Sequence, residues 1–493
     1  MSQREGMQEQ TLKEKTAKGL FWGGLSNGLV QMLNLVFGIF LARLLTPADY
    51  GMVGMLTVFS NLAAALQEGG FISALTNRKD VTHCDYNAVF WFCTGVSLCL
   101  YIMLFACAPL IADFYNQPEL VKLARVSFIG FVISSMGIAP CAYLFKNLKV
   151  KEASMSLFFA LIGSGIVGVT LAYNGMAYWG IVFQSLTYVT IVCTLRFWFA
   201  HWHPTFTFSV QPIREMIGFS SRLVITNVFN IINANLFSIV LGKYYSEKEV
   251  GYYNQASKWN NMGNSTIASM IQGVAQPTLT KLTDDRERQL KVLRKLLRFT
   301  AFVSFPALFG LSITSGELIT IAITEKWIRS AELMQILCIG GAFVPISTLL
   351  SNLIISRGHS NVYMWNTIAL SLVQLLAVIV TYRYGIEPMI YAFVGINIGW
   401  IAVWVHFVEG EVGLTLSSTL KDMAPYLLLS AALALFCTHA TTEMKNTYLR
   451  LITKIIIFAS LYIGMLWALG SKILKESWGY LIQRFRKRVE MEE

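Results

Sequence analysis

Long apolar runs, each bounded by charged or turn-forming residues, dominate the pattern of this chain. A helix needs roughly 20 apolar residues to cross a bilayer, and runs of that length recur about fourteen times. Six of them precede residue 201, six lie between the polar connectors 201–215 and 409–421, and two follow the second connector. The pattern therefore predicts an all-α polytopic membrane protein.

The connectors suggest a division of the chain into segments. In the last of these segments apolar side chains follow one helical face among basic residues, which predicts an amphipathic helix lying on the cytoplasmic leaflet. The first segment has no apolar core that ends in a small-residue cleavage site, so we do not expect a removable signal peptide. The segments are a cytoplasmic N-terminal tail (1–18), an N-lobe of six spans (19–200), a cytoplasmic connector (201–215), a C-lobe of six spans (216–408), a connector with two further spans (409–471) and the basic C-terminal helix (472–493).

An internal repeat relates the two lobes at an offset of 200 residues. Leu41, Arg43, Thr46, Asp49 and Gly51 recur as Leu241, Lys243, Ser246, Glu249 and Gly251. Both copies connect the first span of a lobe to its second span. Because six spans is an even number, the two lobes share one topology. A parallel repeat of this kind places a pseudo-two-fold axis along the membrane normal, with the substrate path between the lobes.

Polar residues recur at helical spacing on four predicted spans, the first two of each lobe. Unpaired polar groups are costly in hydrocarbon, so these faces must meet one another, another helix or water. Amides that cross-link neighbouring helices would explain any single residue. Aligned polar faces on corresponding helices of both lobes favour a shared polar cavity instead. The candidate substrate-binding residues are Asn27, Gln31, Asn34, Asn61, Asn227, Asn230, Asn233, Asn254 and Asn261, with the cations Arg222 and Lys258.

Ionisable residues inside predicted spans are rarer and more telling than amides. Lys258 has the longest way to a membrane surface and is the strongest functional candidate. Arg222 and Lys258 would favour an anionic ligand group, because Arg grips phosphate in a fork and Lys acts as a point charge. Glu68 is a candidate for ion coupling. Each of the three could instead snorkel to an interface.

Composition agrees with the pattern and excludes several classes of protein. Of the 493 residues, 55% are hydrophobic and 14% are charged, whereas a soluble domain carries about a quarter charged residues. Few residues remain outside the apolar runs to form a separate catalytic domain. The composition is therefore that of a carrier, a channel or a small intramembrane enzyme. The net charge of +11 indicates basic cytoplasmic segments rather than nucleic-acid binding. Lys and Arg concentrate in the two tails and in 281–298, so we expect both termini in the cytoplasm.

Other reactive residue types do not form a metal or redox site. The eight cysteines lie mostly in apolar runs and form no CxxC pair. His201 and His203 lack the further ligands that a metal needs. Asp284 and Asp285 precede a basic segment, where we expect them to cap a helix. We expect no metal and no cofactor, with transport coupled at most to a proton or sodium gradient.

The junction from Leu41 to Gly51 resembles the signature that follows the first span in Wzx-type polysaccharide transporters. These belong to the multidrug/oligosaccharidyl-lipid/polysaccharide (MOP) exporter superfamily. Further stretches resemble the second half of that family in the same order, and the resemblance covers about 19–408. The stretches are Gly251 to Ala256, Gln276 to Pro277, Phe305 to Pro306, Glu325 to Trp327, Gln335 to Leu337 and Arg357 to Gly358.

This resemblance implies a flippase and not an enzyme. Such proteins move undecaprenyl-pyrophosphate-linked oligosaccharide repeat units from the cytoplasmic to the periplasmic leaflet of the bacterial inner membrane. They do so by alternating access, for the assembly of O-antigen, capsule or exopolysaccharide. The implied partners are the lipid-linked substrate, membrane lipids, a polysaccharide polymerase and glycosyltransferases, with no nucleic acid.

Three alternatives stay open. The first is a multidrug or cation antiporter of the same superfamily, against which the extra pair of spans and the basic cavity residues count. The second is a peptidoglycan-precursor lipid flippase. The third is a membrane-embedded polymerase or glycosyltransferase, which would want a substantial external loop or an acidic metal motif, and the sequence has neither.

Overall fold

The computed structural model describes residues 28–207, 209–471 and 473–476, and for 217–226 it describes the backbone only. These residues form helices joined by turns and short loops, and no strand occurs among them. The predicted all-α class is therefore confirmed. The N-terminal tail and most of the predicted C-terminal amphipathic helix lie outside the described residues.

Ten helical segments in the described part of the chain are long and apolar enough to cross a membrane. Some of them are broken into shorter helices, as in α5 (Leu120–Ser127), α6 (Ile129–Met136) and α7 (Ile138–Lys146). The protein is thus a multi-pass membrane protein. The ten segments are α4 (His83–Tyr115), α5 to α7 (Leu120–Lys146), α8 (Val150–Tyr173), α9 (Tyr178–Ala200), α13 (Arg286–Ile313), η1 with α15 and α16 (Glu325–Ser356), α17 with η2 (Ser360–Tyr384), α18 (Ile386–Val412), α19 (Leu416–Ala440) and α20 (Thr447–Ala468).

The other four predicted spans are the ones with polar faces. They correspond to the shorter apolar helix Gly28–Leu44 and to α2 (Pro47–Glu68), α10 (Gln211–Ala234) and α12 (Glu247–Lys281). The last three are long enough to cross a membrane, but their polar residues keep them out of the strongly apolar set. Together with the ten apolar segments they give the fourteen crossings that the sequence predicts.

Short helices extend several of these spans. They are α3 (Phe71–Asn77) after α2, α11 (Leu236–Tyr244) after α10 and α14 (Ser315–Ile323) after α13. Inside the long segment that begins at Glu325, η1 (Glu325–Trp327), α15 (Ile328–Gly341) and α16 (Val344–Ser356) follow one another, and η2 (Tyr382–Tyr384) ends α17 (Ser360–Thr381).

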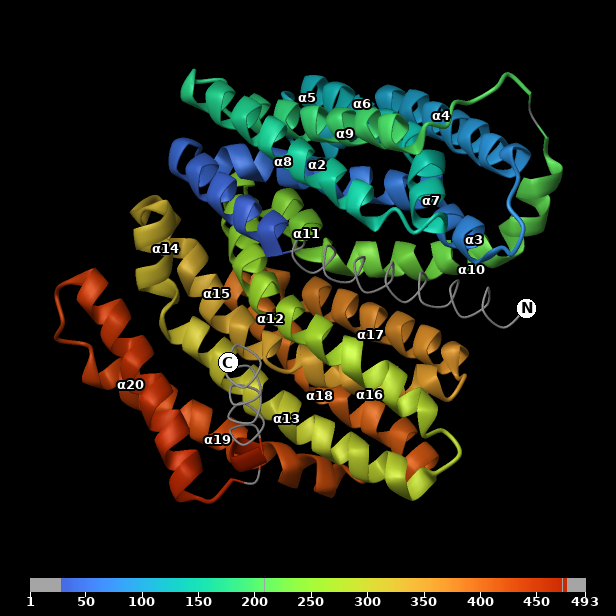
Figure 1. The fold of residues 1–493 in the computed structure, drawn as a ribbon. Helices are drawn as coiled ribbons and strands as arrows, with labels where there is room; N and C mark the ends of the chain where they lie inside the picture. Colours follow the sequence, from blue (N-terminus) through green and yellow to red (C-terminus); the bar gives the residue numbers. More distant parts are fainter. Residues whose placement is uncertain (1–27, 208, 472, 477–493) are drawn as a thin grey trace, which may run out of the picture. The chain divides into compact units, whose positions relative to one another are not determined.

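The chain forms two compact units, Met1–Gly251 and Tyr252–Glu493. In the first unit α8 runs beside α9, and α6 packs against both α4 and α9 (Figure 1). In the second unit α13 lies along α19, and α15 and α16 both pack against α18. The lobe boundaries drawn from the sequence repeat stay a prediction.

The repeated sequence signature marks the start of a helix in both copies. Thr46 caps α2, since its Oγ1 accepts a hydrogen bond from the backbone N–H of Asp49 at 3.3 Å and Asp49 Oδ2 accepts one from the N–H of Thr46 at 2.8 Å. In the second copy, Ser246 Oγ accepts from the N–H of Glu249 at 3.4 Å as α12 begins. A hydroxyl followed three residues later by an acid forms a capping box, which explains why the pattern recurs.

The two signature glycines make reciprocal contacts within the first unit. A Cβ at Gly51 would overlap the backbone carbonyl of Glu247, and a Cβ at Gly251 would overlap the carbonyl of Pro47. Glu247 is the repeat counterpart of Pro47, 200 residues further along. A contact in which each residue touches the counterpart of its partner is what a local two-fold relation produces. Only glycine allows the two backbones to approach this closely.

In the second unit, a buried acid ties the start of α19 to α13. Asp422 is 8% exposed, and its two carboxylate oxygens accept from Arg294 Nε at 2.7 Å and Nη2 at 3.0 Å. Arg298 Nε adds a second cation at 3.3 Å. Asp285 caps the same helix α13, because its Oδ1 accepts from the N–H of Arg288 at 2.9 Å. That confirms the predicted capping role for Asp285; the role predicted for Asp284 stays a prediction.

A second cluster of the same composition holds the start of α20. Glu317 on α14 is 2% exposed, and its Oε1 lies 2.5 Å from Arg450 Nε and 2.7 Å from Lys454 Nζ. Lys454 also donates to the carbonyl of Ile313 at 2.8 Å. Because α19 and α20 form a helical hairpin, the two clusters anchor its opposite ends.

Candidate functional site

A continuous polar face runs along α12 in the second unit. Its members are all exposed and follow one another at intervals of three or four residues: Lys258, Asn261, Ser265, Ser269, Gln272, Gln276 and Thr280. We call this set the α12 stripe. On a helix that turns about 100° per residue, the seven positions fall within about 100° of arc.

The α12 stripe is long enough to traverse a membrane. Between Lys258 and Thr280 the helix rises by about 33 Å at 1.5 Å per residue, and the hydrocarbon core is about 30 Å thick. Side chains of this polarity cannot face hydrocarbon unpaired, so the stripe must border water or a polar ligand. A shallow hollow that includes Ser269, Gln272 and Gln276 follows its second half.

An apolar edge lies beside the α12 stripe. Met270 and Val274 are 65% and 57% exposed, and they point roughly 120–160° around the helix from Lys258. Around Met270 and Val274 the exposed surface of α12 therefore has a polar side and an apolar side. This division is expected of a helix that borders both water and lipid.

Most of the other predicted site residues are also accessible. In the first unit, Gln31, Asn34, Asn61, Asn227 and Asn230 are exposed. Asn261 on α12 is exposed as well, with its amide 3.4 Å from Ser257 Oγ. These six amide side chains are thus not sealed in dry packing between helices.

Four predicted residues need separate mention. Asn233 is half-buried, and its Oδ1 is buried without a hydrogen-bond partner among the described residues. Asn254 is half-buried in the second unit. Asn27 lies outside the described residues, and the side chain of Arg222 does too. The binding role assigned to these four residues, as to every other member of the predicted set, stays a prediction.

Glu68, the candidate for ion coupling, is exposed at the end of α2 and lies within electrostatic range of Arg196 on α9. Arg196 Nε is buried and unpaired among the described residues. The sequence analysis did not single out Arg196, although it is an arginine inside a predicted span. Its position four residues before the end of an apolar run is the signal that could have found it.

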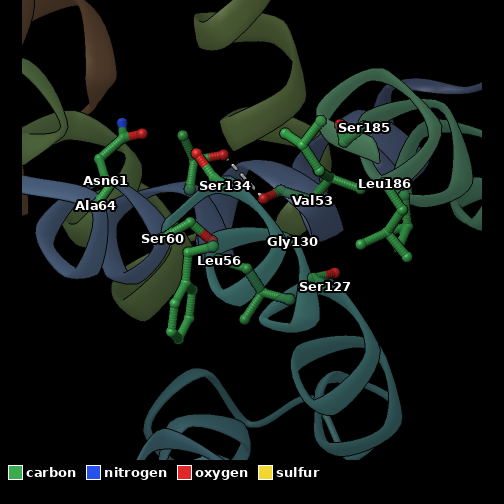
Figure 2. A pocket seen from close by; sticks show the side chains of 14 residues that line it. Val53, Leu56, Ser60, Asn61, Ala64, Ser127, Gly130, Ser134, Ser185 and Leu186 are labelled. Atoms are coloured by element: carbon green, nitrogen blue, oxygen red, sulfur yellow. Dashed lines mark hydrogen bonds between the residues drawn. The ribbon is translucent and has the colours of Figure 1, made fainter. Parts of the chain in front are cut away.

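A cavity of about 300 Å³ opens inside the first unit between α2, α5, α6 and α9 (Figure 2). Asn61 is the one predicted site residue on its wall. The other polar wall residues are all hydroxyls, and none of the residues that line it is charged. We call this cavity the hydroxyl pocket; its polar wall consists of Thr57, Ser60, Asn61, Ser127, Ser134 and Ser185.

Comparison with known families identifies the chain. The family model described as "Polysaccharide biosynthesis protein" matches residues 40–332, which is more than half of the sequence. The chain belongs to this family of polysaccharide biosynthesis proteins. The matched region contains the repeated signature, α2, α10 and α12. The membrane class and family inferred from the sequence signature are confirmed.

Individual relatives agree with the family. The chain is 24% identical over 358 residues to the lipopolysaccharide biosynthesis protein WzxC of Escherichia coli, covering 71% of this chain and 72% of that one. It is 23% identical over 466 residues to the succinoglycan biosynthesis transport protein ExoT of Rhizobium meliloti, covering 92% and 93%.

A solved structure supports the fold. The lipid II flippase MurJ in an inward closed conformation superposes with a TM-score of 0.73, covering 91% of this chain and 99% of that one at 16% sequence identity. At this identity the likeness concerns the arrangement of helices only.

Proposed function

We propose that this protein is a flippase that carries lipid-linked oligosaccharide repeat units from the cytoplasmic to the periplasmic leaflet of the inner membrane. The observation that carries the proposal is the α12 stripe, an exposed polar path on a helix of membrane length. Membership in a polysaccharide biosynthesis family and similarity to a protein named as a succinoglycan biosynthesis transport protein support the choice of cargo.

The physical task explains why a stripe is needed. A sugar chain with its pyrophosphate cannot enter hydrocarbon, because each polar group would lose its hydrogen bonds to water. A polar path shields the head group, while the polyprenyl tail stays in lipid beside the apolar edge at Met270 and Val274. Lys258 near one end of the stripe and Lys281 near the other supply positive charge for the pyrophosphate.

The movement is transport without bond cleavage, so the protein needs no catalytic residue, metal or cofactor. We place both termini in the cytoplasm, because the basic tails and the basic start of α13 then lie on that side. In this orientation Lys258 is near the periplasmic surface and Lys281 near the cytoplasmic one. A polysaccharide polymerase and glycosyltransferases of the same biosynthetic pathway would be its partners.

Transport needs a driving force, and Glu68, which lies within electrostatic range of Arg196, is our candidate for coupling to a proton or sodium gradient. The glutamine variant Glu68→Gln removes the charge at nearly constant shape. We expect it to abolish the dependence of transport on the gradient. Ion dependence identical to that of the unmodified protein would remove Glu68 from the mechanism.

The main experiment measures flipping in vesicles and growth of a deletion strain for two sets of α12 variants. Lys258→Ala and the double variant Gln272→Leu with Gln276→Leu interrupt the stripe, whereas Met270→Ala and Val274→Ala change the apolar edge. We expect the first set to lose at least tenfold in transport with normal membrane insertion, and the second set to retain it. Full activity in the first set would overturn the proposal.

A further inference from the structure

The hydroxyl pocket has polar groups that the protein itself does not satisfy. Ser127 Oγ is buried and has no hydrogen-bond partner among the residues that the structure describes. Thr57 donates to the carbonyl of Val53 within its own helix at 3.0 Å, the contact drawn in Figure 2. In the described part of the chain, Ser60, Ser134 and Ser185 have no hydrogen-bond partner for their hydroxyls. Ser60 and Ser134 are half-buried and Ser185 is exposed, so water or a ligand in the cavity must supply the hydrogen bonds that the wall itself does not make.

Helix packing places these hydroxyls on one cavity. Thr57, Ser60 and Asn61 share a face of α2 at intervals of three and four residues, and Ser127 and Ser134 share a face of α5 and α6 at an interval of seven. Ser185 completes the wall from α9. Gly130 keeps the space open, since even a Cβ there would lie 3.3 Å from Leu186 Cδ2.

The chemistry of the wall defines the class of ligand. A hydroxyl donates one hydrogen bond and accepts two, so serine and threonine pair with ligand groups of the same dual character. No lining residue is charged, so neither a phosphate nor a metal ion finds a counter-charge here. The remaining wall is apolar, with Leu56, Phe131 and Val182 offering surfaces for C–H groups. Alternating hydroxyls and C–H surfaces are the features of an uncharged sugar ring.

We propose that the hydroxyl pocket is a binding subsite for one uncharged sugar of the cargo glycan, separate from the α12 stripe, where Lys258 would hold its pyrophosphate. This inference rests on the proposed flippase function. A cavity of about 300 Å³ lies at the small end of ligand pockets, which span roughly 300–1,000 Å³. The pocket therefore suits a single ring and not a longer oligosaccharide.

The test separates sugar binding from transport. Full-length protein in detergent is titrated with the methyl glycosides of glucose, galactose, mannose and N-acetylglucosamine, with methyl glucuronide as the charged counterpart, and binding is followed by saturation-transfer NMR. None of these probes contains a lipid or a phosphate. The variants are Ser127→Ala, Ser134→Ala and Ser60→Leu, the last of which fills the pocket from α2.

The matched control is Ser135→Ala. Ser135 neighbours Ser134 on α6, does not line the pocket, and already donates to the carbonyl of Val132 at 2.7 Å. We expect one neutral glycoside to bind, with about two- to tenfold weaker binding for each pocket serine removed and no change for the control. Ser127→Ala should not lower thermal stability, because it removes a hydroxyl that has no partner.

Two results would overturn the sugar subsite. One is glycoside binding that is unchanged in all three pocket variants. The other is the absence of binding by every neutral glycoside, together with normal flipping of the lipid-linked repeat unit by Ser60→Leu. Failure of the unmodified protein to flip any lipid-linked glycan would instead count against the proposed function, so the two failures are distinguishable.

Discussion

The buried carboxylate of Glu317 allows a quantitative prediction for the C-terminal helix pair. Glu317→Gln keeps the shape of the side chain but leaves the two cations on α20, Arg450 and Lys454, facing each other without a counter-charge. In the unmodified protein Lys454 is only 7% exposed, too deep for its ammonium group to reach water when the carboxylate is lost. We expect α20 to loosen from α14.

The expected magnitude follows from the burial of the cluster. Breaking a buried ion pair from one side costs about 3–5 kcal/mol. The side chain of Arg450 is 34% exposed, so water compensates part of the lost interaction. We therefore expect Glu317→Gln to lower the free energy of unfolding by about 3 kcal/mol. If the second unit unfolds cooperatively, that lowers its melting temperature by about 6–12 °C. Lys454→Met should cost less, because Arg450 remains on the carboxylate.

Two measurements check this prediction. Thermal unfolding in detergent gives the melting temperature, and mass spectrometry of maleimide-treated protein gives the labelling rate of Cys437, which is buried on α19. Glu476→Gln is the control, since it removes a solvent-exposed ion pair with Lys295 whose contribution should be at most about 1 kcal/mol. If Glu317→Gln changes the melting temperature and the labelling rate no more than the control does, the conclusion that Glu317 holds α20 against α14 is refuted.

Two further substitutions test the packing. Gly51→Ala places a methyl group on the carbonyl of Glu247, so we expect severalfold less folded protein by fluorescence-detected size-exclusion chromatography. Gly95→Ala is the control, because Gly95 has open space around it and its variant should express normally. Equal yields of the two variants would contradict the close approach of the two backbones. Asp422→Asn leaves Arg294 and Arg298 without their carboxylate. Because their side chains are 37% and 40% exposed, water screens part of the loss, and we expect a cost of at most about 3 kcal/mol in thermal unfolding. An unchanged melting temperature would show that this cluster contributes nothing.

The spans and their polar faces could be predicted because both are local patterns. The hydrophobic period and the length needed to cross a bilayer are written in consecutive residues. The same pattern identified α2, α10 and α12 as helices with a polar side, and these are the long spans that fall outside the strongly apolar set. Thr46 and Asp49 likewise predict a helix start within four residues.

Pairs that are distant in sequence could not be predicted in this way. Asp422 meets Arg294 across 128 residues, and Glu317 meets Lys454 across 137. No periodic pattern encodes such partners, because they are set by how whole helices pack. Lys454 lies within the last apolar run of the sequence, but nothing in that run identifies the acid that it pairs with.

The hydroxyl pocket was missed for a different reason. Serine is small and weakly polar, and its hydroxyl often donates to a carbonyl of its own helix, as Ser135 does. A serine on a membrane helix therefore carries little information by itself. Only the convergence of α2, α5, α6 and α9 makes Ser127 and Ser134 distinct from the other serines of the chain.

Cysteine accessibility along α12 tests the central claim most directly. In a background without the eight native cysteines, single cysteines are placed at residues 258–280 and treated with a membrane-impermeant charged thiosulfonate in open vesicles. We predict slow reaction of the cysteines that replace Met270 and Val274. We predict rapid reaction of the cysteines that replace the residues of the α12 stripe: Lys258, Asn261, Ser265, Ser269, Gln272, Gln276 and Thr280. Equal rates at both groups, or protection of the whole stripe, would contradict a hydrated polar path across the membrane.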